Sequence, residues 1–461
     1  MQSTKKFLPV RPFKIIVIFL FALFIPCLCI CTSSAQQVFQ QVQINSSFNP
    51  VGSGARAMGM GGAFIAVADD ATAASWNPAG LIQLELPEVS MVGSYFNIRE
   101  ELESSSHPEA SGMNEKRSYD LNYLSFAYPF KFLNHNMVAS LNYQRLYDMY
   151  KSMNSHYTFS GTFTDGSPFE LDQAVRYKQD GGVKALAPAL AVQITPQLSL
   201  GMTLNIWTDE LFWENGWSQR YYAKGKGNVR GVPIETKDSI YEKYSSFEGV
   251  NFNVGFLWDV NSVMTIGGVL KTPFTADMHH RYKYHTQQTY PTYGYTTEGK
   301  YGFSEDVELS MPMSYGIGFA FRLSDALTTS LDVYRTEWSE FFMEDGKGND
   351  TSPISGIPRK DSHVHDTTQA RAGIEYLIVR EKTIIPLRAG LFYDPQPSEK
   401  HPDDFFGFTL GTGIMIENVV IDWAYVFRYG ANVRGDSFGS AGIKEDVTQH
   451  SVLVSVIYHF Q

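Results

Sequence analysis

The sequence predicts an all-β protein, an antiparallel transmembrane β-barrel of about 14 strands. Three observations lead to this prediction. The chain begins with an export-signal pattern, and apolar and polar residues alternate with period two in many segments after residue 88. Short turns and long polar connections then follow one another in strict alternation along the chain.

The first 35 residues have the pattern of a secretory signal peptide. A basic n-region precedes an apolar stretch at 15–30, and Ser33-Ser34-Ala35 places small residues at a cleavage site before Gln36. A retained membrane anchor and a lipoprotein signal are the alternatives, and the small-residue site favours cleavage. All three cysteines of the chain lie inside this segment. We therefore expect the mature protein to contain no disulfide.

The mature chain is acidic. The signal segment holds four of the 37 basic residues and no acidic residue, which leaves 33 basic against 48 acidic residues and a formal charge of −15. This balance argues against nucleic acid as a partner, since phosphates need a basic face. Beyond the signal no apolar run approaches the roughly 20 residues that a spanning helix needs. No linker-like composition divides the chain, so one continuous architecture is expected.

Alternating segments follow one another from residue 88 to the C-terminus. In one of them Val250, Phe252 and Val254 alternate with Asn251 and Asn253. Their lengths are close to the roughly 9–11 residues of a tilted membrane strand. The predicted strands lie near 88–98, 119–130, 136–148, 182–194, 198–211, 246–258, 263–273, 305–322, 327–340, 366–378, 383–394, 405–416, 419–429 and 447–460.

The connections between these strands alternate in length without exception. Short turns are predicted at 131–135, 195–197, 259–262, 323–326, 379–382 and 417–418, and long polar loops at 99–118, 149–181, 212–245, 274–304, 341–365, 395–404 and 430–446. This rhythm is typical of an up-and-down barrel with short periplasmic turns and long external loops. A secreted β-sandwich would also alternate, but it would not explain outward faces that end in Trp, Tyr and Phe. The sheet must close because hydrocarbon leaves no partner for an unpaired backbone group.

The final strand, Ser451 to Phe460, looks like the signal read by the outer-membrane assembly machinery, with Gln461 following the last aromatic residue. We expect that machinery as a partner, together with outer-membrane lipid and lipopolysaccharide. The expected location is the outer membrane of a Gram-negative bacterium, and the expected state is a monomer.

A segment rich in glycine and alanine, Gly54 to Leu81, lies between the signal and the first strand and ends in Asn77-Pro78-Ala79-Gly80. It resembles the N-terminal hatch of the FadL/TodX family, outer-membrane barrels that import long-chain fatty acids and hydrocarbons. The match covers the Asn77-Pro78-Ala79 motif and the preceding Ala68-Asp69-Asp70-Ala71. The runs Leu387 to Asp394 and Asp422 to Tyr425 are also similar to the family.

The resemblance implies three parts: a signal peptide at 1–35, a hatch at 36–87 that plugs the lumen from the periplasmic side, and a barrel at 88–461. The expected gate residues are Asp69, Asp70, Asn77, Pro78, Ala79 and Gly80. Gly59, Gly61 and Gly62 would let the backbone pass close to the wall at positive φ. A phosphate-binding glycine loop is disfavoured because no Gly-Lys-Ser/Thr context follows. Adjacent Asp69 and Asp70 point apart, which favours anchoring or capping over paired catalytic carboxylates.

Charged residues gather on the predicted lumen face of the C-terminal strands. They are Arg371, Glu375, Arg388, Asp394, Asp422 and Arg428. One interpretation is an ionic network that braces barrel against hatch. The other is that Arg371, Arg388 or Arg428 binds a substrate carboxylate through a bidentate pair.

The loop 212–245 is dense in aromatic residues, with Phe212, Trp213 and Trp217 as candidates for a ligand-capture surface. Packing of one loop on another is the alternative. The pairs His279-His280 and His363-x-His365 lack acidic or cysteine ligands at standard metal spacing, so a surface role is favoured over a metal site. No cofactor is expected, and no Ser-His-Asp pattern or nucleophile elbow suggests an enzyme.

The resemblance implies passive uptake of a hydrophobic compound, with long-chain fatty acid as the default substrate and aromatic hydrocarbon as an alternative. Two further alternatives are a general porin, which would lack a plug, and a FadL-shaped barrel that serves protein secretion. An outer-membrane enzyme is the most remote.

Overall fold

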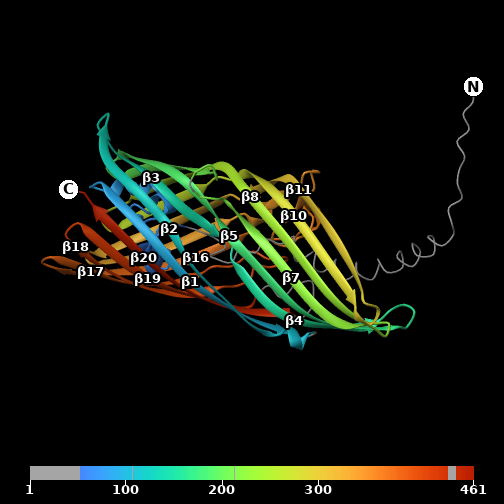
Figure 1. The fold of residues 1–461 in the computed structure, drawn as a ribbon. Helices are drawn as coiled ribbons and strands as arrows, with labels where there is room; N and C mark the ends of the chain where they lie inside the picture. Colours follow the sequence, from blue (N-terminus) through green and yellow to red (C-terminus); the bar gives the residue numbers. More distant parts are fainter. Residues whose placement is uncertain (1–51, 106, 212, 434–442, 461) are drawn as a thin grey trace, which may run out of the picture.

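The computed structural model describes residues 52–105, 107–211, 213–433 and 443–460. The predicted signal peptide, with Phe212, therefore lies outside the described residues. Within them, 20 strands belong to one antiparallel sheet, and helices are short (Figure 1).

Fourteen of these strands close into a barrel. Each pairs with the next around the ring, and the last, β20, pairs with β1 from Glu88↔His459 to Ser104↔Ile443. The barrel strands are β1 (Glu88–Ser104), β2 (Gly112–Phe132), β3 (His135–Asp148), β5 (Pro168–Thr195), β6 (Leu198–Trp207), β8 (Val232–Asp259), β9 (Met264–Lys271), β12 (Ser314–Ser324), β13 (Leu327–Thr336), β16 (Thr367–Arg380), β17 (Thr383–Tyr393), β18 (Phe406–Ile416), β19 (Val419–Val433) and β20 (Ile443–His459). The predicted fold class and strand number are confirmed.

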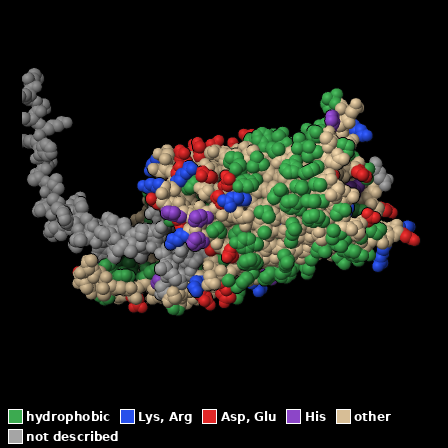
Figure 2. Space-filling model, turned by 180° about the vertical axis from the view of Figure 1, so that it is seen from behind, with side chains coloured by type: hydrophobic (Ala, Val, Ile, Leu, Met, Phe, Trp, Pro, Cys, Tyr) green, Lys and Arg blue, Asp and Glu red, His purple; other side chains and the backbone are tan. Residues whose placement is uncertain are grey.

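On the barrel wall, apolar side chains face outward and polar side chains face inward. On β8, Phe252 is 38% exposed while its neighbour Asn253 is 1% exposed. The apolar outward residues form a broad band around part of the molecule (Figure 2). Such a band fits a hydrocarbon environment, whereas a soluble barrel would reverse the two faces. Among the described residues, no helix has the length and hydropathy to span a membrane.

Four of the predicted long loops, 99–118, 149–181, 212–245 and 274–304, are largely strands, and for these the sequence-based prediction was wrong. Residues 149–181 and 212–245 contain β4 and β7 together with the first halves of β5 and β8. The six strands outside the barrel ring are β4 (Lys151–Thr162), β7 (Gly216–Val229), β10 (Phe274–Tyr290), β11 (Tyr295–Met311), β14 (Phe342–Glu344) and β15 (Asp350–Thr351). Figure 1 shows β4, β7 and β10 extending past one end of the barrel, away from the C-terminus.

The predicted strand at 305–322 is also corrected. β11 ends at Met311, and the barrel strand β12 begins at Ser314. Pro312 lies between them and has no N–H to donate to a ladder. The proline thus separates an external strand from a barrel strand.

The helices of the described residues are short. Between residue 52 and β1 these are α3 (Ala55–Gly59), α4 (Ala73–Trp76) and the 3₁₀ helix η1 (Pro78–Gln83). The others are the 3₁₀ helices η2 (Pro108–Ala110), η3 (Pro291–Tyr293), η4 (Trp338–Glu340) and η5 (Arg359–Asp361).

Candidate binding cavity between the hatch segment and the barrel wall

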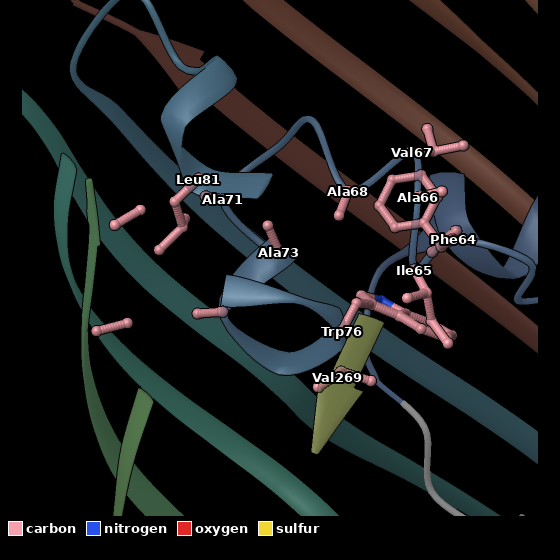
Figure 3. Packing of buried hydrophobic residues seen from close by; sticks show 14 of the residues in the cluster. Phe64, Ile65, Ala66, Val67, Ala68, Ala71, Ala73, Trp76, Leu81 and Val269 are labelled. Carbon is pink, nitrogen blue, oxygen red and sulfur yellow. The ribbon is translucent and has the colours of Figure 1, made fainter. Parts of the chain in front are cut away.

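Residues 52–87, termed the hatch segment, pack against side chains of the barrel strands. Phe64, Ile65 and Trp76 are buried and share one apolar cluster with Val269 of β9 (Figure 3). Alanines of β2 and β5 belong to the same cluster. Small wall residues of this kind leave space for a chain that runs beside them.

Wall glycines allow the hatch backbone to approach the strands closely. A Cβ at Gly390 of β17 would lie 2.2 Å from the backbone nitrogen of Gly61, and one at Gly201 of β6 would lie 2.3 Å from that of Ala79. Real Cβ atoms do not come this close to backbone. Within the hatch segment, Gly61 and Gly62 adopt φ of 70° and 71°, as expected, whereas Gly59 ends α3.

Asn77 connects the hatch segment to itself and to the wall. Its amide nitrogen donates to the carbonyls of Ile65 and of Phe256 on β8, at 2.9 Å and 2.8 Å. Its amide oxygen accepts a bond of 3.2 Å from the backbone of Ala79. Pro78 then occupies the first turn of η1, where a missing N–H costs nothing. The motif therefore builds a turn whose capping side chain also reaches the wall.

Asp69 and Asp70 have different partners. Asp69 pairs with Arg56 at 2.6 Å, and Asp70 accepts bonds from the backbone and hydroxyl of Thr72. Burial raises the pKa of the Asp70 carboxyl. Gly80 lies against Ala68, where a Cβ would meet the carbonyl oxygen at 2.1 Å. These contacts hold the hatch segment together, and the two adjacent carboxylates bind separate partners.

An ion network joins the hatch segment to the wall. Arg56 bonds Glu375 of β16 at 2.8 Å, and Arg388 of β17 bonds Glu375 at 2.5 Å and Asp422 of β19 at 2.6 Å. The Arg388 guanidinium is thus held between two buried carboxylates. This arrangement corresponds to the bracing interpretation for Arg388.

Arg371 and Arg428 form a separate group around Asp394. Arg428 lies 3.2 Å and Arg371 3.6 Å from the Asp394 carboxylate, and Arg371 also donates to the carbonyl of Gly61. Both arginines line a cavity of about 130 Å³ between the hatch segment and the wall. Its apolar lining includes Met58, Trp76, Phe96, Phe392, Val426 and Leu453.

A third arginine, Arg145 of β3, lines the same cavity and was not predicted. It pairs with Asp120 at 2.7 Å and also with Asp148. Gln144 faces inward, so strict alternation along the strand predicts that Arg145 faces the lipid. A register shift against β5 between Arg145 and Tyr147 breaks that alternation. Only knowledge of the bulge could have located this residue.

The predicted capture residues of loop 212–245 lie in different environments. Trp217 is buried on β7 and stacks on Tyr244 at 4.8 Å. Trp213 is half-buried, packs edge-on against Tyr143 and donates to the carbonyl of Thr208. Neither forms part of the cavity lining. Their role in ligand capture stays a prediction.

The histidines of the first pair, His279 and His280, lie beside acidic residues. His279 lies 2.9 Å from Asp306, and His280 lies 3.8 Å from both Glu242 and Glu305. The part of the chain that the structure describes contains no group of three or more His, Cys, Asp or Glu residues that could hold a metal ion.

Comparison with known proteins agrees with this architecture. Solved structures with the same fold include a FadL homologue of Pseudomonas aeruginosa, at 13% identity and TM-score 0.54, covering 89% of this chain and 99% of that chain. The toluene transporter TodX of Pseudomonas putida is 13% identical with TM-score 0.53, covering 91% and 100%. The toluene transporter TbuX of Ralstonia pickettii is 14% identical with TM-score 0.50, covering 90% and 100%. No curated protein matches the chain.

The family model described as outer membrane protein transport protein (OMPP1/FadL/TodX) matches residues 30–434, most of the sequence. The chain therefore belongs to the OMPP1/FadL/TodX family of outer membrane transport proteins.

Proposed function

We propose that this protein carries out passive uptake of long-chain fatty acids across the outer membrane. Membership of the family supports the general function, which is transport of hydrophobic compounds through a barrel that is not an enzyme. The choice of a fatty acid rests on the cavity beside the hatch segment, which has a mixed lining of arginines, other polar residues, and apolar residues such as Trp76 and Phe392.

The charges in this cavity suit a carboxylate. Arg371 and Arg428 both lie beside the carboxylate of Asp394, so this group holds two cations and one anion. Arg145, the third arginine of the lining, is instead paired with two carboxylates, those of Asp120 and Asp148. A fatty acid would place its head group at these arginines and its chain against residues such as Trp76 and Phe392. Guanidinium–carboxylate pairs are charge-assisted and geometrically specific, which favours an acid over a neutral ligand.

The hatch segment is the gate in this proposal. Its backbone lies against wall glycines, and the Arg56–Glu375 pair ties it to β16. A ligand would leave, sideways or toward the periplasm, after these contacts open. The gate residues Asp69, Asn77 and Pro78 would act by holding the closed arrangement.

Aromatic hydrocarbon is a second candidate, and the cavity volume favours it. A volume of about 130 Å³ is close to the roughly 150 Å³ of an apolar cavity that holds benzene. A long-chain acid would require the cavity to widen on binding.

Binding of matched ligands to the Arg371→Gln variant separates the two candidates. We expect affinity for a fatty acid to fall about tenfold, because a charged hydrogen bond is lost, while affinity for toluene is unchanged. Arg322→Gln, an exposed change at a short turn, is the control. Unchanged fatty-acid affinity would count against the acid-binding role.

Lipid extracted from the purified protein and identified by mass spectrometry gives an independent test. Recovered fatty acid would support the proposal. Normal fatty-acid uptake in a deletion strain, together with capture of secreted proteins, would support the secretion role instead.

A further inference from the structure

The external strands form a sheet with two chemically different sides. β4, β7, β10 and β11 pair with the outer halves of β5 and β8 to build it. One side carries buried apolar residues, among them Tyr177, Ala223 and Ile240. The other side is therefore the solvent side.

The solvent side is strongly basic. Residues that lie opposite one another on successive strands form rows across the sheet. Four neighbouring rows on the solvent side, from the row that contains Asp180 to the row that contains Glu298, hold nine basic residues and two acidic ones, Asp180 and Glu298. We term the nine the basic face: Arg176, Lys178, Arg220, Lys224, Lys237, Lys243, Arg281, Lys283 and Lys300. Eight are exposed and Lys243 is half-buried. The chain as a whole has a formal charge of −11, so the concentration of positive charge is local.

Like charges lie directly opposite one another on this face. Lys178 is paired with Arg220, Lys224 with Lys237, and Lys243 with Arg281. Directly opposed like charges destabilise a sheet. Within the described residues, no carboxylate lies within 4.0 Å of the charged groups of six of the nine: Arg176, Arg220, Lys224, Lys237, Arg281 and Lys283. An external anion would relieve this repulsion.

The basic face continues the lipid-facing side of the barrel. Along β5, Arg176, Lys178 and Lys184 lie on the same side as Leu186 and Leu190, whose side chains face the hydrocarbon. The row of Asp180 lies six residues from Leu186, which is roughly 20 Å along a strand. Because barrel strands are tilted by roughly 40°, this corresponds to a height of about 15 Å above Leu186. The basic face therefore lies on the external side of the lipid-facing residues, toward the phosphorylated sugars of the outer leaflet.

We propose that the basic face binds the phosphate groups of the lipopolysaccharide core around the barrel. Charge complementarity and position beside the lipid select this partner. The proposal rests on outer-membrane residence and is independent of the transported compound. Its failure would leave the proposed uptake function untouched.

The test compares two quadruple variants of the full-length protein with equal charge changes. One is Lys178→Gln/Arg220→Gln/Lys243→Gln/Arg281→Gln on the basic face. The control is Lys131→Gln/Arg322→Gln/Arg380→Gln/Lys382→Gln, all exposed residues at the short-turn end. Heat-modifiable gel migration verifies that each barrel is folded. The probe is labelled rough-type lipopolysaccharide with a phosphorylated core, and the same molecule after dephosphorylation.

We expect the basic-face variant to bind the phosphorylated probe about tenfold more weakly than the parent, because four exposed cations that would pair with phosphate are lost. The control variant should bind like the parent, and dephosphorylation should remove the difference between variants. Equal binding by parent and basic-face variant would overturn the proposal. So would equal binding of the dephosphorylated probe, or equally tight binding of a single-stranded oligonucleotide at the same salt concentration.

Discussion

At the residue scale, a few buried polar side chains connect the hatch segment to the wall. Asn77 bonds to β8, Asp332 of β13 accepts from the backbone of Phe64 and Ile65, and Arg388 lies between Glu375 and Asp422. Each is a specific contact in a low-dielectric setting, so loss of one partner leaves another polar group without compensation.

Asn77→Ala is expected to loosen the hatch segment by about 2 kcal/mol, since the carbonyls of Ile65 and Phe256 lose their donor. Hydrogen exchange of the amides between Gly61 and Leu81 should speed up accordingly. Gln83→Ala, which removes one partly buried bond to Val67, should have a smaller effect. Unchanged exchange in the Asn77 variant would show that this side chain does not hold the segment.

Arg388→Leu is expected to destabilise the protein by about 3–5 kcal/mol, because two buried carboxylates lose their shared cation. Affinity for fatty acid should remain that of the parent, since Arg388 is not part of the cavity lining. Chemical denaturation and ligand titration measure the two effects separately. A loss of fatty-acid affinity with unchanged stability of the fold would indicate that Arg388 binds the head group.

At the scale of elements, the backbone of the hatch segment packs closely against the wall strands because both contain glycines at the points of contact. Glycine in a strand weakens it, so its presence in β6, β8, β17 and β18 has a cost that close packing offsets. Where a Cβ would meet backbone rather than a flexible side chain, the hatch segment must move.

Gly390→Ala is therefore expected to displace the hatch segment, since the new Cβ would lie 2.2 Å from the nitrogen of Gly61. Gly93→Ala is the matched control, because a Cβ at this position on β1 has no atom within 4 Å. Limited proteolysis from the periplasmic side and ion conductance should both increase for the first variant. An equal response from both variants would refute the close-packing argument.

At the scale of the whole molecule, the barrel is a closed ring of inter-strand hydrogen bonds. The β1–β20 pairing completes it, and none of the 14 barrel pairings involves the hatch segment. The barrel should thus persist without the segment, while the lumen would open.

Deletion of residues 54–81 is expected to leave heat-modifiable migration intact and to raise single-channel conductance well above that of the parent. Planar bilayer recording of both purified proteins makes the comparison. A parent that already conducts like an open pore would argue against a plug and for the general porin.

The sequence by itself determined the strand number, the lipid-facing side of most strands and the membrane class. These properties depend on local alternation and on segment length, which any single strand displays. The inward set that includes Arg371, Glu375 and Arg428 followed from the same rule, and burial of all three agrees with it.

Only the tertiary structure decided which charges meet. Arg145 turns inward at a bulge, Arg388 and Arg371 belong to separate groups, and the polar external segments pair as strands with one basic side. The overall negative charge argued against nucleic acid as a partner, but a net charge does not show where basic residues gather. Cross-strand neighbours such as Lys243 and Arg281 lie far apart in the chain, so their proximity depends on register, which local pattern does not specify.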